Sequence, residues 1–167
     1  MEPIVIVDKD DNIIGHKKWQ DETVDDITRI SALWIENSRG QILLARRALN
    51  KKYDPGKWGP AVAGTLEKNE TYYSNIIKET EEEIGLTQIS PTPGPKLFVR
   101  NNDRNFFAQY YTLKLDRDIT DFIIQKDEVM DIKWWDKPEL EKRIKTHPEE
   151  FTPTLSEIMQ HQSNENN

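Results

Sequence analysis

The segment "GTLEKNETYYSNIIKETEEEIGL", residues 64–86, decides the fold of this chain. Thr71 is a residue type that begins helices, and Gly85 is a type that ends them in a left-handed conformation. Between these two positions, side chains suited to a core recur at helical spacing: Tyr73, Ile76, Ile77, Thr80 and Ile84. The segment therefore predicts a helix from Thr71 to Ile84.

Glu79, Glu82 and Glu83 have i, i+3, i+4 spacing within this helix and share one face. Like charges at such spacing destabilise an isolated helix by roughly 0.2–0.5 kcal/mol per pair. Lys78 is the only basic residue in the run 78–86. A hard divalent cation such as Mg²⁺, which prefers oxygen ligands, would convert the repulsion into binding. The alternative is a solvated helix face, which the spacing of these three residues alone favours.

A wider spacing reverses that preference. Gly64 is followed after five residues by Glu70 and, after seven more, by "KETEEEIGL", residues 78–86. This pattern resembles the Nudix box. The positions that match it are Gly64, Glu70, Glu79, Glu82, Glu83, Gly85 and Leu86. Lys78 replaces the arginine of the box, and Thr80 stands at an apolar position.

The resemblance implies an α/β fold, the Nudix α/β/α sandwich with a mixed β-sheet. It also implies hydrolysis of a diphosphate linkage in a nucleoside diphosphate linked to another moiety, X. Mg²⁺ or Mn²⁺ would be the cofactor and a small-molecule diphosphate the substrate, because cations neutralise the charge that gathers on phosphate oxygens. A non-catalytic Nudix module that binds a nucleotide or a protein stays open, because Lys78 departs from the box.

The resemblance assigns metal ligands by position in the box. Glu79, Glu82 and Glu83 would hold the metal, and one of them would also activate water. The carbonyl of Ala63, directly before the box, would add a ligand. Glu70 would brace the loop or hold a metal through water.

Four further residues take roles from the same resemblance. Lys78 would orient the glutamate that follows it, and Gly64 and Gly85 would be structural residues of the box. Glu128, in "KDEVMDIKWW" before a predicted strand, would be a further catalytic carboxylate of the kind the family uses. The alternative for Glu128 is an ordinary exposed acid in a loop.

Arg46, Arg47 and Trp58 are the candidate substrate-binding residues. The two arginines end the strand "ILLARR", where a guanidinium could clamp a diphosphate through paired hydrogen bonds. Because side chains alternate along a strand, we expect only one of them to face the cleft. Trp58, in "PGKWGP", resembles a Pro-Gly-x-Trp element of the family, and packing of the loop is favoured over stacking on a base.

A second, looser resemblance covers nearly the whole chain. An N-terminal hairpin, "TRISALWIENSRGQILLARR", "DPGKW" and "HPEEFTPTLSEIMQ" are similar to isopentenyl-diphosphate isomerase and its Nudix relatives. This resemblance raises allylic isomerisation of an isoprenoid diphosphate as an alternative. The isomerases use a cysteine before the box and a histidine where Ser31 stands, whereas this chain has no cysteine and keeps its box acids. These departures favour a hydrolase on an isomerase-like frame.

Composition limits the class of partner. The chain has 167 residues, a net charge of −7 and no cysteine. The negative charge argues against a nucleic-acid polymer or an anionic membrane as partner, and the absence of thiols excludes disulfides and zinc–thiolate sites. The N-terminus lacks the features of a signal peptide and no apolar run is long enough to span a membrane, so we expect a cytoplasmic protein. A homodimer is compatible with such folds.

The remaining elements follow from alternation and turn residues. We expect one domain over residues 1–160 and a disordered tail over 161–167. Asp136 should cap a helix with Pro138 in its first turn. Trp134 and Trp135 should point to opposite sides of a strand, with one in the core. The predicted strands are 3–8 and 12–18 as an N-terminal β-hairpin, 29–37 and 41–48 as a second hairpin, 61–66, 95–102, 105–115 and 131–136, and the later helices are 137–147 and 154–162.

Overall fold

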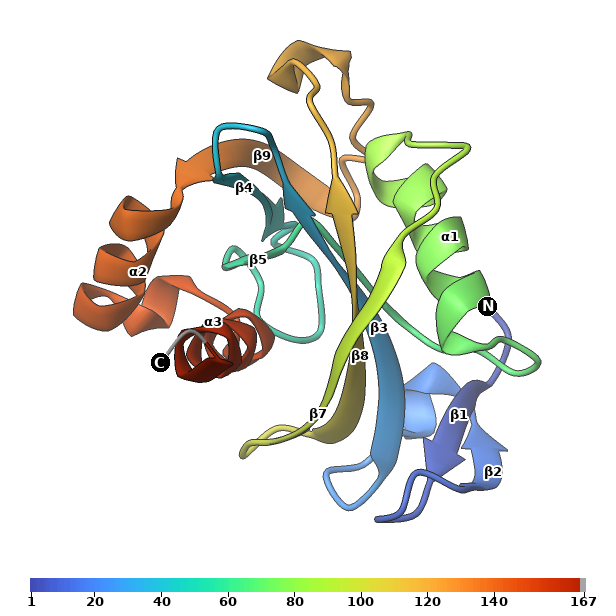
Figure 1. Cartoon of the computed structure of the whole chain (residues 1–167). Coiled ribbons are helices and arrows are strands. Elements are labelled where there is room, and N and C mark those ends of the chain that lie inside the picture. The colour runs from blue at the N-terminus through green and yellow to red at the C-terminus, as the bar shows by residue number, and fades with distance from the viewer. Residues whose placement is uncertain (166–167) are drawn as a thin grey trace.

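The structure is a computed structural model that describes residues 1–165, and it has the predicted α/β/α architecture with a mixed sheet (Figure 1). The strands are β1 (Ile4–Val7), β2 (Ile13–Lys17), β3 (Ile27–Glu36), β4 (Gln41–Arg47), β5 (Trp58–Pro60), β6 (Val62–Thr65), β7 (Thr92–Arg100), β8 (Asn105–Lys114) and β9 (Val129–Asp136). The helices are α1 (Tyr72–Ile84), α2 (Lys137–Thr146) and α3 (Pro153–Glu165), with 3₁₀ turns at Trp19–Asp21, Ile119–Asp121 and Pro148–Glu150.

Strand β3 is the hub of the sheet. It pairs antiparallel with β1, β4 and β6, and parallel with β8 along its whole length, from Ile27 opposite Asn105 to Glu36 opposite Lys114. Strand β2 joins β1, β7 joins β8, and both β5 and β9 join β4. A strand enclosed on both faces requires a continuous apolar run, and residues 30–35 of β3 are all buried.

Alternate residues of β3 supply two cores on the two faces of the sheet. On one face its side chains pack with residues of α2 and α3; this cluster includes Ile30, Ala32, Trp34, Leu140, Leu155 and Ile158. On the other face they pack with α1; this cluster includes Leu33, Ile35, Ile76 and Ile84. Figure 1 shows α1 on the opposite side of the sheet from α2 and α3. Within residues 1–165, no helix has the length and apolar character needed to cross a membrane.

Both predicted ends of α1 are confirmed. The Thr71 hydroxyl accepts a hydrogen bond from the Ser74 N–H at 3.0 Å, and the Thr71 N–H donates to the Ser74 hydroxyl at 2.9 Å, which forms a capping box. Gly85 ends the helix with φ of 69°. Thr80 is tolerated at its buried position because its hydroxyl donates to the Ile76 carbonyl at 2.6 Å.

Several sequence predictions need correction. The last helix extends to Glu165, because intrahelical hydrogen bonds propagate beyond its buried turn, so disorder from residue 161 is wrong; residues 166 and 167 lie outside the described part. Strand β5 is missing from the predicted strands, and its pairing with β4 holds it in the sheet. Asp136 occupies the N-cap of α2, but its carboxylate accepts from Gln41 Nε2 at 3.1 Å instead of capping the helix.

We predict that Gly85→Ala destabilises the protein more than Gly40→Ala. Both glycines have positive φ, which costs an alanine about 1–2 kcal/mol. A Cβ at Gly40 would meet no heavy atom within 4 Å, whereas at Gly85 it would lie 2.9 Å from the Ile123 Cβ. Urea denaturation should show an additional loss of about 1–3 kcal/mol for Gly85→Ala, the range for overpacking. Equal losses of unfolding free energy in the two variants would mean that the αL conformation alone, and not contact with Ile123, requires glycine at position 85.

Candidate active site

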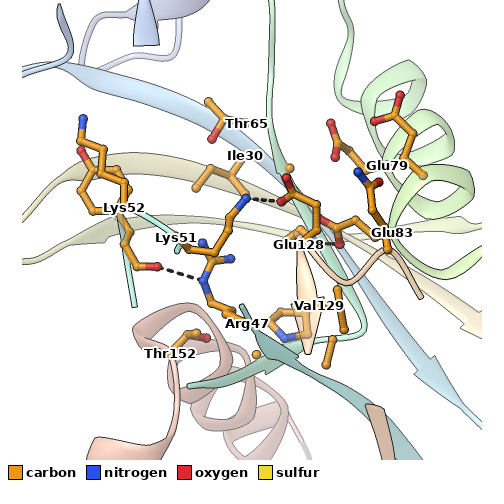
Figure 2. Close-up of a pocket in the computed structure, with 18 of the residues that line it drawn as sticks. Ile30, Arg47, Lys51, Lys52, Thr65, Glu79, Glu83, Glu128, Val129 and Thr152 are labelled. Atoms are coloured by element: carbon orange, nitrogen blue, oxygen red, sulfur yellow. Dashed lines mark hydrogen bonds and ion pairs between the residues drawn. The ribbon is translucent and has the colours of Figure 1, made fainter. Parts of the chain in front are cut away.

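A pocket of about 450 Å³ opens between α1, strand β6, the loop after β4 and the segment before β9. Figure 2 shows Glu79 and Glu83 projecting from α1 on one side of it, with Arg47, Lys51 and Lys52 on the other. Glu128 lies between the two groups. The pocket therefore has an acidic wall on the helix and a basic wall on the loop after β4.

The acidic wall contains the three predicted glutamates, all of which line the pocket. Glu82 is exposed at its rim, whereas Glu83 is buried and accepts a hydrogen bond from the Ala63 N–H at 3.4 Å. Burial raises the pKa of Glu83 to about 8, and the negative charges of Glu79 and Glu128 add to the rise. Burial likewise raises the pKa of Glu79 to about 7, an effect that Lys78 partly opposes. The carboxylates are thus mutually repelling oxygen donors in a partly dry cleft.

Gly64 is required where α1 crosses β6. A Cβ at this position would lie 2.3 Å from the Glu79 Cγ and 2.5 Å from its Cδ. A larger side chain would fit between the strand and the helix only if the Glu79 side chain were displaced. The glycine therefore allows Glu79 to lie across the strand and reach the pocket.

The loop before α1 is held by Glu70 and Lys78. Glu70 accepts from the Glu67 N–H at 2.8 Å, from Asn75 Nδ2 at 2.9 Å and from the Lys78 ammonium at 2.7 Å. Although burial acts in the opposite direction, these donors lower the pKa of Glu70. The Lys78 ammonium is also 3.5 Å from a Glu79 carboxylate oxygen, so it contacts the glutamate that it was expected to orient. Glu70 does not itself line the pocket, which agrees with the bracing role.

The expected metal cage is not assembled. Among residues 1–165, no three His, Asp or Glu side chains are grouped closely enough to hold a metal ion. The physical reason is that the carboxylates repel one another and take separate donors: Glu79 from Asn75 and Lys78, and Glu83 from Ala63. The donor chemistry nevertheless fits a divalent cation, because burial and, after it, mutual repulsion raise the pKa values of Glu79 and Glu83, so added positive charge is favourable there.

The three candidate substrate-binding residues differ in whether they line the pocket. Arg47 lines the pocket, and its Nε donates to the Tyr53 carbonyl at 3.0 Å. Arg46 does not line it and donates to the Gly56 carbonyl at 2.9 Å, as strand alternation requires. Trp58 packs against the core and stacks edge-on with Trp135 at 5.6 Å, outside the pocket lining. Only Arg47 keeps a direct path to a ligand.

Glu128 lines the pocket and is partly buried. Its carboxylate forms an ion pair with Lys51, and its charge contributes to the raised pKa of Glu83. Its position is fixed by backbone bonds on both sides, since the Glu128 N–H donates to Gln125 and the Glu128 carbonyl accepts from Ala48.

The two adjacent tryptophans do point to opposite sides of β9. Trp135 is buried in the cluster with α2 and α3, and Trp134 is partly buried against the α1 cluster beside Phe122. Neither lines the pocket, so the core tryptophan is Trp135 and the partly exposed one is Trp134.

Sequence patterns missed Asn75, which lies behind the pocket, and several residues that line it. Asn75 is fully buried and donates to both Glu70 and Glu79, so it connects the loop to the helix glutamate. It carries no local signal beyond being a polar residue on the buried face of a predicted helix. The other missed residues line the basic wall and come from three separate segments: Trp19, Lys51, Lys52, Tyr53 and Arg104.

The NUDIX domain model matches residues 27–155, which include the whole sheet from β3 onward and α1. The chain belongs to the NUDIX family. Curated relatives of this NUDIX protein include the isopentenyl-diphosphate Delta-isomerase of Escherichia coli O17:K52:H18, which is 29% identical over 143 residues, 83% of this chain and 79% of that protein. The Shigella flexneri isomerase is 29% identical over 151 residues with the same coverage, 83% and 79%.

Solved structures share the NUDIX fold of this chain. DR0079 from Deinococcus radiodurans superimposes with a TM-score of 0.80 at 21% identity, over 96% of this chain and 98% of that one. The NUDIX domain of Shewanella oneidensis NrtR, complexed with ADP ribose, gives a TM-score of 0.64 at 14% identity, over 84% of this chain and 88% of that one. At these identities the similarity concerns the fold.

The NUDIX protein departs from the isomerase pattern at Ser31. This residue stands where the resemblance to the isomerases places a histidine, and it is completely buried with its hydroxyl donating to the Asn75 amide oxygen. None of the three histidines of the chain lines the pocket. Ser31 therefore holds Asn75, which in turn donates to Glu70 and Glu79.

We predict that Gly64→Ala weakens Mg²⁺ binding with little loss of stability. The atoms that a Cβ would displace belong to the flexible Glu79 side chain, so the loss of unfolding free energy should be about 1 kcal/mol, the low end for overpacking. The displaced Glu79 should lower Mg²⁺ affinity at least about tenfold in isothermal titration calorimetry, as misplaced donors do. Gly15→Ala, where a Cβ meets nothing within 4 Å, is the matched control. Unchanged affinity in Gly64→Ala would contradict this reading of the contact.

Proposed function

We propose that this NUDIX protein hydrolyses a diphosphate linkage in a nucleoside diphosphate linked to another moiety, with Mg²⁺ or Mn²⁺. The observation that carries the proposal is the placement of Glu79, Glu82 and Glu83 along one wall of a pocket whose other wall holds Arg47 and Lys51. Carboxylates suit a divalent cation, and guanidinium and ammonium groups suit phosphate oxygens. The two walls are therefore complementary to a metal-bound diphosphate.

Glu79, Glu82, Glu83 and the carbonyl of Ala63 would hold the cation, and Glu70 would brace their loop. When bound, the cation neutralises charge on phosphate oxygens and lowers the pKa of a coordinated water. The chain itself must orient the diphosphate and accept one proton. Water oxygen attacks one phosphorus, the bridging P–O bond breaks, and the bridging oxygen leaves with the other phosphate.

Three residues of the chain would serve this reaction directly. Arg47 faces the pocket and would orient the diphosphate through its terminal nitrogens, since its Nε is occupied by the Tyr53 carbonyl. Glu128 or a box glutamate would accept the proton of the attacking water. Lys51, paired with Glu128, would keep that carboxylate directed into the pocket.

Isopentenyl-diphosphate isomerisation is the second candidate. The curated relatives with that name, at 29% identity, favour it. The absence of cysteine from the whole chain and the buried Ser31 weigh against it. A non-catalytic nucleotide-binding module is the remaining alternative.

Purified protein with Mg²⁺ should be tested against a panel of nucleoside diphosphate derivatives and against isopentenyl and dimethylallyl diphosphate. We expect release of a phosphate or a nucleotide from at least one compound and no interconversion of the two isoprenoid diphosphates. Isomerisation without hydrolysis would establish the second candidate, and saturable nucleotide binding without either reaction would establish the binding module.

Glu82→Gln and Glu81→Gln form a matched pair for the metal. The residues are adjacent on α1 and both exposed, but only Glu82 lines the pocket. We expect Mg²⁺ to raise the Tm of the wild type and of Glu81→Gln through binding to the native state, and to raise that of Glu82→Gln much less. Hydrolysis should fall on the order of a hundredfold in Glu82→Gln, about 2.7 kcal/mol of lost transition-state stabilisation, and stay within about twofold in Glu81→Gln. Equal Mg²⁺ responses in the two variants would mean that these glutamates form a solvated helix face and not a metal site.

A further inference from the structure

Arg104 is the one basic residue of the pocket that comes from the β7–β8 hairpin. It precedes β8 directly, and its backbone is fixed because its N–H donates to the Asn101 side chain at 2.9 Å while its carbonyl accepts from the Asn101 N–H at 3.1 Å. Its exposed fraction is only 8%, although its side chain lines the pocket. A buried arginine on a fixed backbone is pre-organised for a ligand.

Two aromatic rings cover the guanidinium of Arg104. Its Cζ lies 4.3 Å from the centroid of Tyr53 and 4.6 Å from that of Phe106. Tyr53 is in turn held by Glu22, whose carboxylate accepts from its hydroxyl at 2.7 Å. Ring contacts stabilise the cation but accept no N–H hydrogen bonds in the plane of the guanidinium. The N–H groups at the edge of the guanidinium therefore remain available to donate hydrogen bonds to oxygen atoms.

The guanidinium of Arg104 has no polar partner in the described part of the chain. No hydrogen bond or ion pair joins it to residues 1–165, and its buried Nε is without an acceptor. Burial lowers the pKa of Arg104 to about 10, and the positive charge of Arg47 adds to the fall, whereas the charges of Asp54 and Glu22 partly oppose it. Buried polar groups in native proteins are almost always paired, because leaving them unpaired is costly. A buried arginine kept without a partner therefore points to an anion from outside.

The neighbouring cations show the contrast. Lys51 pairs with Glu128, and Lys52 lies 3.2 Å from Glu22. Arg47, like Arg104, forms no ion pair among the described residues, and only its Nε is used, by the Tyr53 carbonyl. Among the described residues, the basic wall thus contains two lysines that form ion pairs and two arginines, together carrying two positive charges, that form none.

We propose that Arg104 and Arg47 form a subsite for the terminal phosphate of the substrate, on the basic wall facing the helix glutamates. Two guanidinium groups match a terminal phosphate, which carries two negative charges and has oxygens that can accept paired hydrogen bonds. An internal phosphate diester carries one charge and a carboxylate carries one, so both leave one arginine uncompensated. The subsite therefore selects compounds that end in a phosphate, such as nucleoside di- and triphosphates, over compounds whose phosphates are all esterified on both sides.

The assignment of this phosphate to the substrate rests on the proposed function, but binding can be tested without it. Inorganic phosphate and dimethyl phosphate serve as probes of the dianion and the monoanionic diester, at about pH 8 where a phosphate monoester is dianionic. Affinities would be measured by isothermal titration calorimetry on the full chain with EDTA present, so that no hydrolysis is involved. We expect the wild type to bind inorganic phosphate at least about tenfold more tightly than dimethyl phosphate.

The variants are Arg104→Met and Arg104→Lys, with Arg100→Met as the control. Arg100 is exposed at the end of β7 in the same hairpin, so its replacement removes the same charge outside the pocket. We expect Arg104→Met to lose at least about tenfold in phosphate affinity and Arg104→Lys to lose severalfold, because lysine keeps the charge but not the planar fork. Arg100→Met should stay within about twofold. Circular dichroism checks folding, and Arg104→Lys carries the test if Arg104→Met does not fold.

Two results would overturn the subsite: absence of saturable phosphate binding in the wild type, or equal phosphate affinity in the wild type and in folded Arg104 variants. Equal binding of the two probes would overturn the selection of a terminal phosphate. Failure of hydrolysis with intact, Arg104-dependent phosphate binding would instead reject the proposed function and leave the subsite standing.

Discussion

The approach of α1 to strand β6 at Gly64 is the contact on which the pocket depends. The helix lies so close to the strand that a single Cβ would come within 2.3 Å of the Glu79 side chain. Because the helix is this close, Glu83 reaches the Ala63 N–H of the same strand. The capping box at Thr71 and the αL residue Gly85 fix where the helix begins and ends, and the buried Ile76 and Ile84 side chains fix its rotation. Close packing thus sets the positions of Glu79 and Glu83 on the acidic wall.

Charge is separated across the pocket in a chain whose net charge is −7. The acidic wall is dry enough to raise the pKa of Glu79 and Glu83, and the basic wall gathers four cations on the facing side. The lysines of that wall already have carboxylate partners, whereas the arginines have none among the described residues. Such a local field is what an acidic protein needs to attract a phosphorylated ligand against its overall charge.

Asn75 and Ser31 show how the core supports the pocket. Ser31, at the centre of β3, donates to Asn75, which in turn donates to Glu70 and Glu79. A buried polar chain of this kind is fully satisfied and therefore rigid. It links the hub strand of the sheet to the loop that precedes α1.

Much of the fold could be predicted from local patterns. The apolar run of β3 and the alternating strands β7 and β8 were recognisable because burial on one or both faces leaves a period in the sequence. Strand β5 was not, because its three residues are held by pairing with β4 and carry no period of their own. The Asp136 carboxylate was expected to cap α2, but the pairing of β4 with β9 brings Gln41 to it instead.

The sequence by itself determined the family, the helix α1 and the shared face of its glutamates, because the spacing of the box and the helical period are properties of neighbouring residues. Only the tertiary structure decided which basic residues face those glutamates. Arg46 and Arg47 are indistinguishable in sequence until the twist and pairing of β4 direct one into the pocket. Arg104 reaches the same wall because β8 lies parallel to β3 and carries the hairpin end to Tyr53. Contacts between segments about 50 residues apart leave no trace in local sequence, since they arise from sheet pairing and not from periodicity.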